Sequence, residues 1–211
     1  MPMSKHRMWC LIVLWSLCVL IGSGCYVRDL GKTATPTADM HALMTDASAF
    51  PTNWSVCMGP LPPPERAQGQ HGETESLHTQ LCYEGTGCET FGAEQRLYRY
   101  RTEIEARSAF ESDFSTSEFL YHKSVLTPWH VPDGWAYHSH IADLQHFACA
   151  QLDMGPVGPP EWRCKAVVQY DQYVSALNTN WSPECMTLDQ LGRVLVAIDE
   201  RMAFYLGMDT D

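Results

Sequence analysis

Cysteine content constrains the fold of this chain more than any other feature. The chain has nine cysteines, three within the first 25 residues and the rest at Cys57, Cys82, Cys88, Cys149, Cys164 and Cys185. An even set of six in an exported domain favours disulfide bonds. Zinc is the rival, but the chain has no C-x-x-C pair and no histidines at the spacing of a zinc finger. We therefore predict three disulfides.

The N-terminus indicates export. Lys5, His6 and Arg7 precede an apolar run, residues 8–21, which is about 14 residues long. The run is shorter than the ~20 residues that a membrane-spanning helix prefers. The small residues 22–24 then lead to Cys25. This order is that of a secretory signal peptide.

The segment ending Gly-Ser-Gly-Cys at Cys25 resembles the lipobox of bacterial lipoproteins. The resemblance covers only the first 25 residues. It implies a signal peptide over residues 1–24, acylation of Cys25 with a palmitate-type lipid, and attachment through that lipid to the cell membrane or outer envelope. An uncleaved anchor and an ordinary cleaved signal are the alternatives. We expect a lipid anchor and flexible tether over residues 25–38, followed by one domain over residues 39–211.

The net charge of the chain argues against negatively charged partners. Removal of residues 1–24 would leave 12 of the 14 basic residues and all 25 acidic ones, a formal charge of −13. Such a charge argues against binding to nucleic acid or to an anionic membrane surface. The expected partners are the membrane, through the lipid on Cys25, and an unknown protein or small-molecule ligand.

Hydrophobic periodicity predicts an order of strands and helices. Apolar residues at every second position indicate strands over residues 75–83, 94–101, 135–141, 145–152 and 162–177. Capping boxes at Thr102–Glu105 and Thr187–Gln190 begin two helices, which end near Ser115 and at Leu206. Asp39 caps a third, short helix. The loop at residues 155–160 (GPVGPP) folds two strands together and so pairs Cys149 with Cys164.

The predicted fold class is α+β. We expect an antiparallel sheet of about five strands, two main helices packed on one of its faces, and disulfides that staple it. Arg96, Arg99 and Arg101 on the second strand are able to bind an anion, although a solvated strand face at a sheet edge is the favoured interpretation.

A cluster of histidines is the only candidate for metal chemistry. If residues 142–144 form the loop of a hairpin, His138, His140 and His146 share one face of the sheet. Imidazole ligands suit zinc or copper. The alternative is three exposed or hydrogen-bonded histidines on the wet face of the sheet.

No catalytic residues are predicted. The chain lacks H-E-x-x-H, G-x-S-x-G, G-x-x-x-x-G-K and G-x-G-x-x-G. The favoured function is therefore a non-enzymatic, membrane-anchored extracytoplasmic domain that binds a ligand or a partner protein. The alternatives are a metal-binding protein or metal-dependent envelope enzyme that uses the three histidines, and a structural component of the cell envelope.

Overall fold

The structure is a computed structural model that describes residues 38–85, 92–117 and 125–208. All of these belong to the larger of the two units into which the chain divides, residues 36–211. The expected signal peptide, the lipid site at Cys25, nearly all of the tether and Cys88 lie outside the described residues. Within the described ranges, no helix has the length and apolar character needed to cross a membrane.

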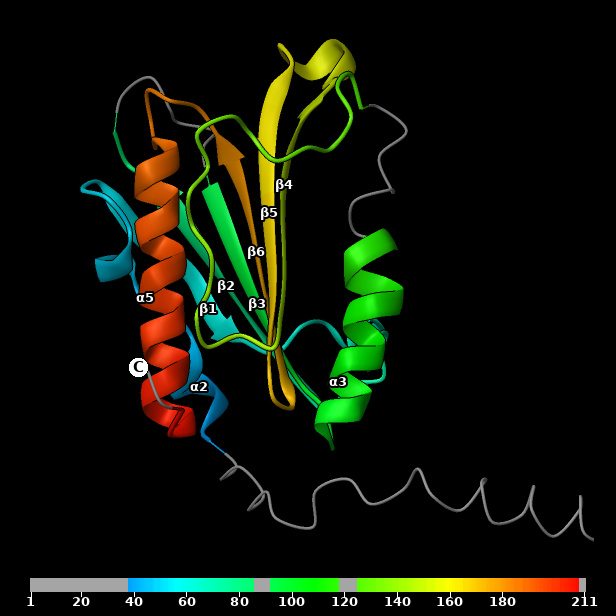
Figure 1. Ribbon diagram of the computed structural model, residues 1–211. Coiled ribbons are helices and arrows are strands. Elements are labelled where there is room, and N and C mark those ends of the chain that lie inside the picture. Colours follow the sequence, from blue (N-terminus) through cyan, green and yellow to red (C-terminus); the bar gives the residue numbers. More distant parts are fainter. Residues whose placement is uncertain (1–37, 86–91, 118–124, 209–211) are drawn as a thin grey trace, which may run out of the picture. The chain divides into compact units, whose positions relative to one another are not determined.

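Six antiparallel strands form one sheet in the order β1-β2-β3-β6-β5-β4 (Figure 1). Their bounds are β1 Trp54–Leu61, β2 Glu75–Tyr83, β3 Gly92–Arg99, β4 Leu144–Leu152, β5 Glu161–Tyr170 and β6 Tyr173–Trp181. The α+β class is confirmed, and β2 has the predicted bounds. The expectation of about five strands misses β1, whose burial does not alternate and whose pairing with β2 is interrupted by bulges.

The predicted long strand over residues 162–177 is wrong. It is two strands, β5 and β6, joined by a tight turn at Asp171 and Gln172, where Tyr170 pairs with Tyr173. Asp171 has a φ of 50°, and its backbone N–H donates a 2.7 Å hydrogen bond to Asp143. The turn is hard to detect because buried residues lie directly on both sides of it, in β5 and in β6.

The predicted strand over residues 135–141 is also wrong. These residues belong to a long irregular segment, residues 125–143, which we call the strap. The strap runs along the free edge of β4, where His130 bridges to Cys149, and then crosses toward α5 (Leu188–Leu206) (Figure 1). Trp135 and Tyr137 still pack on the core. The apolar alternation therefore marks burial here and not a strand.

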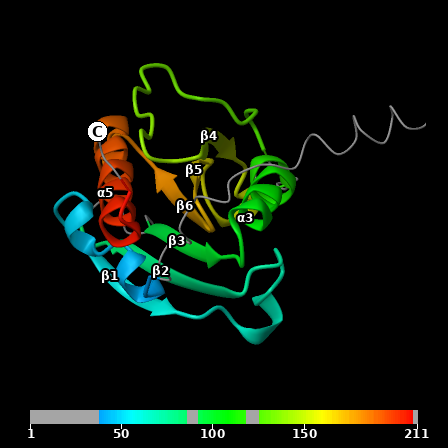
Figure 2. The same cartoon turned by 60° about the horizontal axis from the view of Figure 1, so that its bottom comes forward.

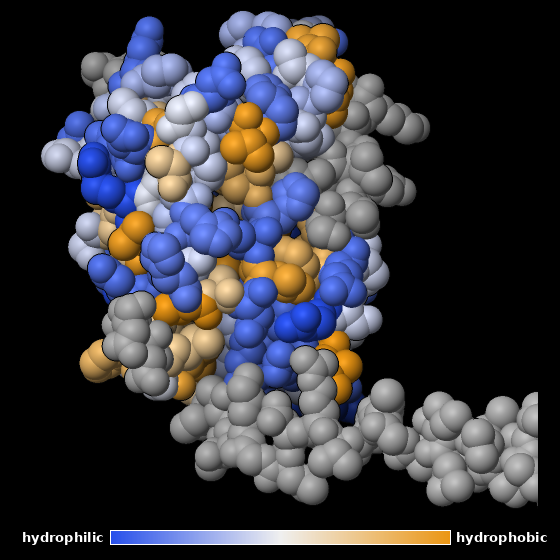
Figure 3. Space-filling view, in the orientation of Figure 1, coloured by the Kyte–Doolittle hydropathy of each residue, from blue (hydrophilic) through white to orange (hydrophobic). Residues whose placement is uncertain are grey.

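One face of the sheet packs against α5 and the short helix α2 (Met40–Leu43). Alternate residues of the strands, such as Leu81, Leu97 and Leu177, meet the apolar stripe of α5 in one cluster. The bounds of α5 are as predicted. Thr187 and Gln190 form the capping box, and Gly207 ends the helix in the left-handed conformation. The outer surface in Figure 3, which includes α5, is mainly hydrophilic with separate hydrophobic spots.

The opposite face packs against α3 (Glu103–Ala109), which continues into a π-helical segment, η3 (Phe110–Ser117). The two main helices therefore lie on opposite faces of the sheet (Figure 2), and the expectation that they share one face is wrong. Tyr98 and Tyr100 are buried against α3. Ile104 of α3 is 78% exposed.

Disulfides fasten both outer strand pairs of the sheet. Cys57 joins Cys82 across β1 and β2, and Cys149 joins Cys164 across β4 and β5, with Cα atoms 4.0 Å apart. The second pairing confirms the prediction. Cys185 is also disulfide-bonded. Cross-links of this kind are typical of proteins from oxidising compartments.

A buried carboxylate connects the strap to both the helix and the sheet. Asp199 of α5 accepts hydrogen bonds from the hydroxyls of Tyr137 (2.6 Å) and Tyr170 (2.5 Å). Burial, together with the charge of Asp199, raises the pKa of both tyrosines well above the ordinary value, so both stay protonated donors. Two donors from different elements hold this buried charge in place.

We expect Tyr137→Phe to lower the free energy of unfolding by about 1–3 kcal/mol, because it removes a donor from a buried carboxylate. Urea unfolding of the oxidised domain measures the change. Tyr205→Phe is the matched control, because Tyr205 lies on the same helix as Asp199 and is 44% exposed. An equal effect of the two substitutions would show that Tyr137 does not clamp the strap through Asp199.

Candidate functional site

The sheet face that carries α3 is divided into apolar and polar rows. Next to α3 the rows are apolar, with Tyr98, Val167 and Val174 in the core cluster of that helix. Farther along the strands, the register places one polar row across β2, β3, β6 and β5: Gln80, Glu94, Asn178 and Lys165. The following row pairs Arg163 with Asn180. The two rows belong to strands far apart in sequence, so only the sheet pairing brings them together.

A cavity of about 210 Å³ lies on these polar rows, and we call it the sheet-face hollow. It is lined by Gln80, Leu81, Cys82, Gly92, Ala93, Glu94, Arg163, Asn178 and Asn180. Gly92 leaves space because it has no side chain, and a Cβ there would come within 3.2 Å of the carbonyl oxygen of Leu81. The lining combines three side-chain amides with one guanidinium and one carboxylate, groups that recognise a ligand by hydrogen bonds.

Two polar atoms of the hollow are buried without a partner among the described residues. They are the side-chain oxygen of Asn178 and Nε of Arg163. Buried polar atoms are nearly always hydrogen-bonded in folded proteins, and leaving one unsatisfied costs about 1–3 kcal/mol. Two such atoms on residues of one cavity are consistent with a binding site whose ligand supplies the missing hydrogen bonds.

The carboxylate of the hollow already has a partner. Glu94 accepts a bidentate pair of hydrogen bonds from Arg96, at 2.9 and 3.0 Å. Burial disfavours the charge of Arg96, but the hydrogen bonds and charge of Glu94 more than offset this and raise its pKa. Lys165, in the same row, is buried and lies 5.3 Å from the ring centre of Trp129. The pair Arg96–Glu94 is neutral as a whole, so Arg163 gives the lining a positive balance.

A second cavity adjoins the hollow and shares Glu94 with it. It has a volume of about 120 Å³ and lies between β2, β3 and the loop around Pro63 and His71. Nδ1 of His78 is a further buried atom with no partner in the described part of the chain. His71 is held by Asp113 at 3.1 Å and by ring packing against Phe114. This cavity continues from Glu94 toward Tyr98, which packs in the cluster of α3.

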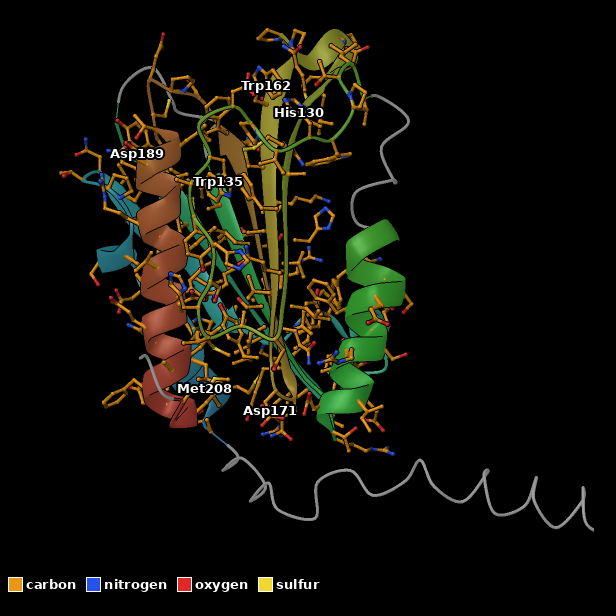
Figure 4. All side chains as sticks on the ribbon, in the orientation of Figure 1. His130, Trp135, Trp162, Asp171, Asp189 and Met208 are labelled. Atoms are coloured by element: carbon orange, nitrogen blue, oxygen red, sulfur yellow. A yellow bond between two sulfur atoms is a disulfide. The ribbon has the colours of Figure 1, made fainter. Side chains whose placement is uncertain are left out.

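A third cavity, of about 330 Å³, lies between the strap and α5. Trp135 forms part of its wall, stacked on Phe147 with ring centres 3.7 Å apart, and Figure 4 shows Trp135 between α5 and the sheet. Its wall is mainly apolar, with Asp189 and Arg193 as the charged residues. The unsatisfied polar atoms Asn178 Oδ1 and Arg163 Nε belong instead to the sheet-face hollow.

The three histidines predicted as metal ligands do not converge. His138 and His140 lie on the strap, with ring centres 6.4 Å apart, and His138 contacts the side chain of Gln145 at 2.6 Å. His146 pairs with Val167, which faces α3, whereas the part of the strap that carries His138 and His140 packs on the other face. The described residues contain no group of three His, Cys, Asp or Glu side chains placed to hold a metal ion. Burial lowers the pKa of His146.

The three arginines considered as an anion site are also separate. Arg96 is bound by Glu94, and Arg99 forms an ion pair with Glu75 at 2.5 Å. Arg101 lies beyond the end of β3 and is exposed. The idea that they protect a sheet edge is wrong, because β3 is central and pairs with both β2 and β6.

The residues of the hollow were not predicted from the sequence, although a local signal exists. Arg163 and Lys165 alternate with the buried Cys164 and Ala166 in β5. Asn178 and Asn180 alternate in the same way with Leu177 and Thr179 in β6. Polar residues on the alternate positions of two central strands indicate a sheet face that the helices do not cover.

The comparisons with known proteins leave the family open. No family model matches the chain, and no curated protein matches it. Among solved structures, the chain is similar to the extracellular domain of PknH from Mycobacterium tuberculosis, with 9% identity and a TM-score of 0.40, over 62% of this chain and 67% of that chain. This similarity is too slight to transfer a function.

We expect Asn178→Leu to leave the free energy of unfolding unchanged or to raise it by about 1 kcal/mol, because it removes a buried oxygen that has no partner. Asn180→Leu is the control in the same strand and on the same face. Asn180 has no buried side-chain atom without a partner among the described residues, so its replacement is not expected to raise the free energy of unfolding. Urea unfolding compares the two. A clear loss of stability in Asn178→Leu would show that its oxygen is satisfied in solution.

Proposed function

We propose that the protein is an extracytoplasmic lipoprotein whose domain binds a small polar ligand in the sheet-face hollow. The signal-like residues 1–24 and Cys25 support the export and the anchor. The disulfides Cys57–Cys82 and Cys149–Cys164 support an oxidising compartment. The anchored domain would then present its hollow outside the cytoplasm.

The observation that carries the binding role is the pair of unsatisfied polar atoms on Asn178 and Arg163. Their cost is recovered when a ligand supplies the missing hydrogen bonds. Binding without catalysis suits the lining, since Cys82 is tied in a disulfide and Glu94 is engaged by Arg96. Neither is available as a nucleophile or a general base.

The anchor is tested at the mature N-terminus. We expect mass spectrometry of the protein from a cell that processes lipoproteins to find Cys25 as the first residue, carrying an acyl-modified thiol. Cys25→Ser should block processing and retain residues 1–24. Cys18→Ser is the control and should mature normally, because the bulky Leu17 precedes Cys18. An unmodified Cys25, or retention of residues 8–24 in the wild type, would refute the anchor.

The binding role is tested by native mass spectrometry of the protein recovered from membranes in mild detergent. The wild type should retain a small molecule that an Arg163→Met, Asn178→Leu double variant lacks, because the variant removes both unpaired atoms. Arg193→Met is the control on the other side of the molecule, and it should retain the molecule. Equal spectra for the wild type and the double variant would contradict binding in the hollow.

A further inference from the structure

We propose that the ligand of the sheet-face hollow is a small hydroxyl-rich molecule that carries one carboxylate, such as a sugar acid. The proposal rests on the proposed function and adds the chemical class of the ligand. Three properties of the lining carry it: the unpartnered Nε of one guanidinium, the charge balance, and the amides around it.

Arg163 supplies the contact for the carboxylate. Its Nε is buried and has no partner among the described residues. In a guanidinium, Nε–H and one neighbouring N–H form a fork that matches the two oxygens of a carboxylate. Because Arg163 lines the hollow and its Nε has no partner among the described residues, we assign the carboxylate of the ligand to this guanidinium.

The charge balance favours a single negative charge on the ligand. Arg163 is the one cation among the cavity's lining residues, all of which are described, and the Glu94 carboxylate beside it is neutralised by Arg96. A phosphate monoester carries about −1.5 to −2 charges near pH 7, whereas a carboxylate carries one. One guanidinium thus balances a carboxylate and leaves a phosphate partly unbalanced.

The side-chain amides of the hollow are the expected partners of the ligand's hydroxyl groups. Gln80 and Asn178 lie on either side of Glu94 in one row, and the side-chain oxygen of Asn178 has no partner among the described residues. An amide both donates and accepts hydrogen bonds, as a hydroxyl does, and a carboxylate oxygen accepts from a hydroxyl. A ligand with several adjacent hydroxyls pairs with this row, whereas a bare carboxylate leaves Asn178 unsatisfied.

Nuclear magnetic resonance titration of the oxidised, isotopically labelled protein tests the proposal with four probes: glucuronate, glucose, acetate and inorganic phosphate. We expect glucuronate to bind most tightly and to shift the Nε–H signal of Arg163 and the side-chain amide signal of Asn178. Glucose lacks the carboxylate, acetate lacks the hydroxyls, and phosphate has the wrong charge, so each should bind more weakly.

Variants separate the two contacts. Arg163→Met should weaken glucuronate binding about 10-fold or more, the factor that corresponds to a lost charged hydrogen bond, and should leave glucose binding unchanged. Asn178→Leu should weaken glucuronate and glucose alike. Arg193→Met, at an exposed arginine of α5, should change neither.

Each contrary outcome overturns the proposal in a distinct way. Equal binding of glucose and glucuronate would remove the role of the charge. Equal binding of acetate or phosphate and glucuronate would leave a simple anion site. No shift with any probe would refute the ligand class, and a small molecule retained by the wild type in native mass spectrometry would show that the binding role itself still stands.

Discussion

Burial of the β5–β6 hairpin on both of its faces is the constraint on which the rest of the structure depends. Tyr170 and Tyr173 flank its turn and are fully buried on the α5 side, while Val167 and Val174 are buried on the α3 side. A sheet with two apolar faces needs a cover on each. The chain supplies α5, α2 and part of the strap for one face, and α3 with η3 for the other.

The two covers are unequal, and the difference creates the candidate site. The helix α5 has 19 residues, whereas α3 has 7 and is extended only by the π-helical segment η3. The rows of the sheet next to α3 are apolar, and the rows beyond it are polar. A sheet face that no helix covers is either exposed to solvent or in contact with a ligand or a partner. Arg163 Nε and Asn178 Oδ1 are buried there without a partner among the described residues, which distinguishes the hollow from an ordinary wet face.

Local signals in the sequence predict the elements that depend on local interactions. The capping box at Thr187 and Gln190 and the stop at Gly207 fix α5, because each satisfies backbone groups within a few residues. The predictions of β2 and of the Cys149–Cys164 disulfide succeed for the same reason. The alternation of β2 is contained in 9 residues, and the two cysteines are 15 residues apart. The prediction of strands fails where an apolar pattern reflects burial in the core and not a single regular strand. The turn at Asp171 interrupts an apolar run, and in the strap Trp135 and Tyr137 alternate because they fill the core without belonging to a strand.

The site depends on pairing between distant parts of the chain, and this is why the sequence does not reveal it. Glu94 meets Asn178 only because β3 pairs with β6, and Asn178 meets Lys165 only through the hairpin. The expectation that the three histidines share a face fails for the same reason. His138 and His140 are near His146 in sequence, but their part of the strap packs on the α5 face and the side chain of His146 faces the other side. Residues that are near in sequence share a face at a predictable spacing only within a regular helix or strand. A polar position on a doubly buried strand is therefore a better guide to a binding site in this fold than a cluster of chemically suitable residues in one segment.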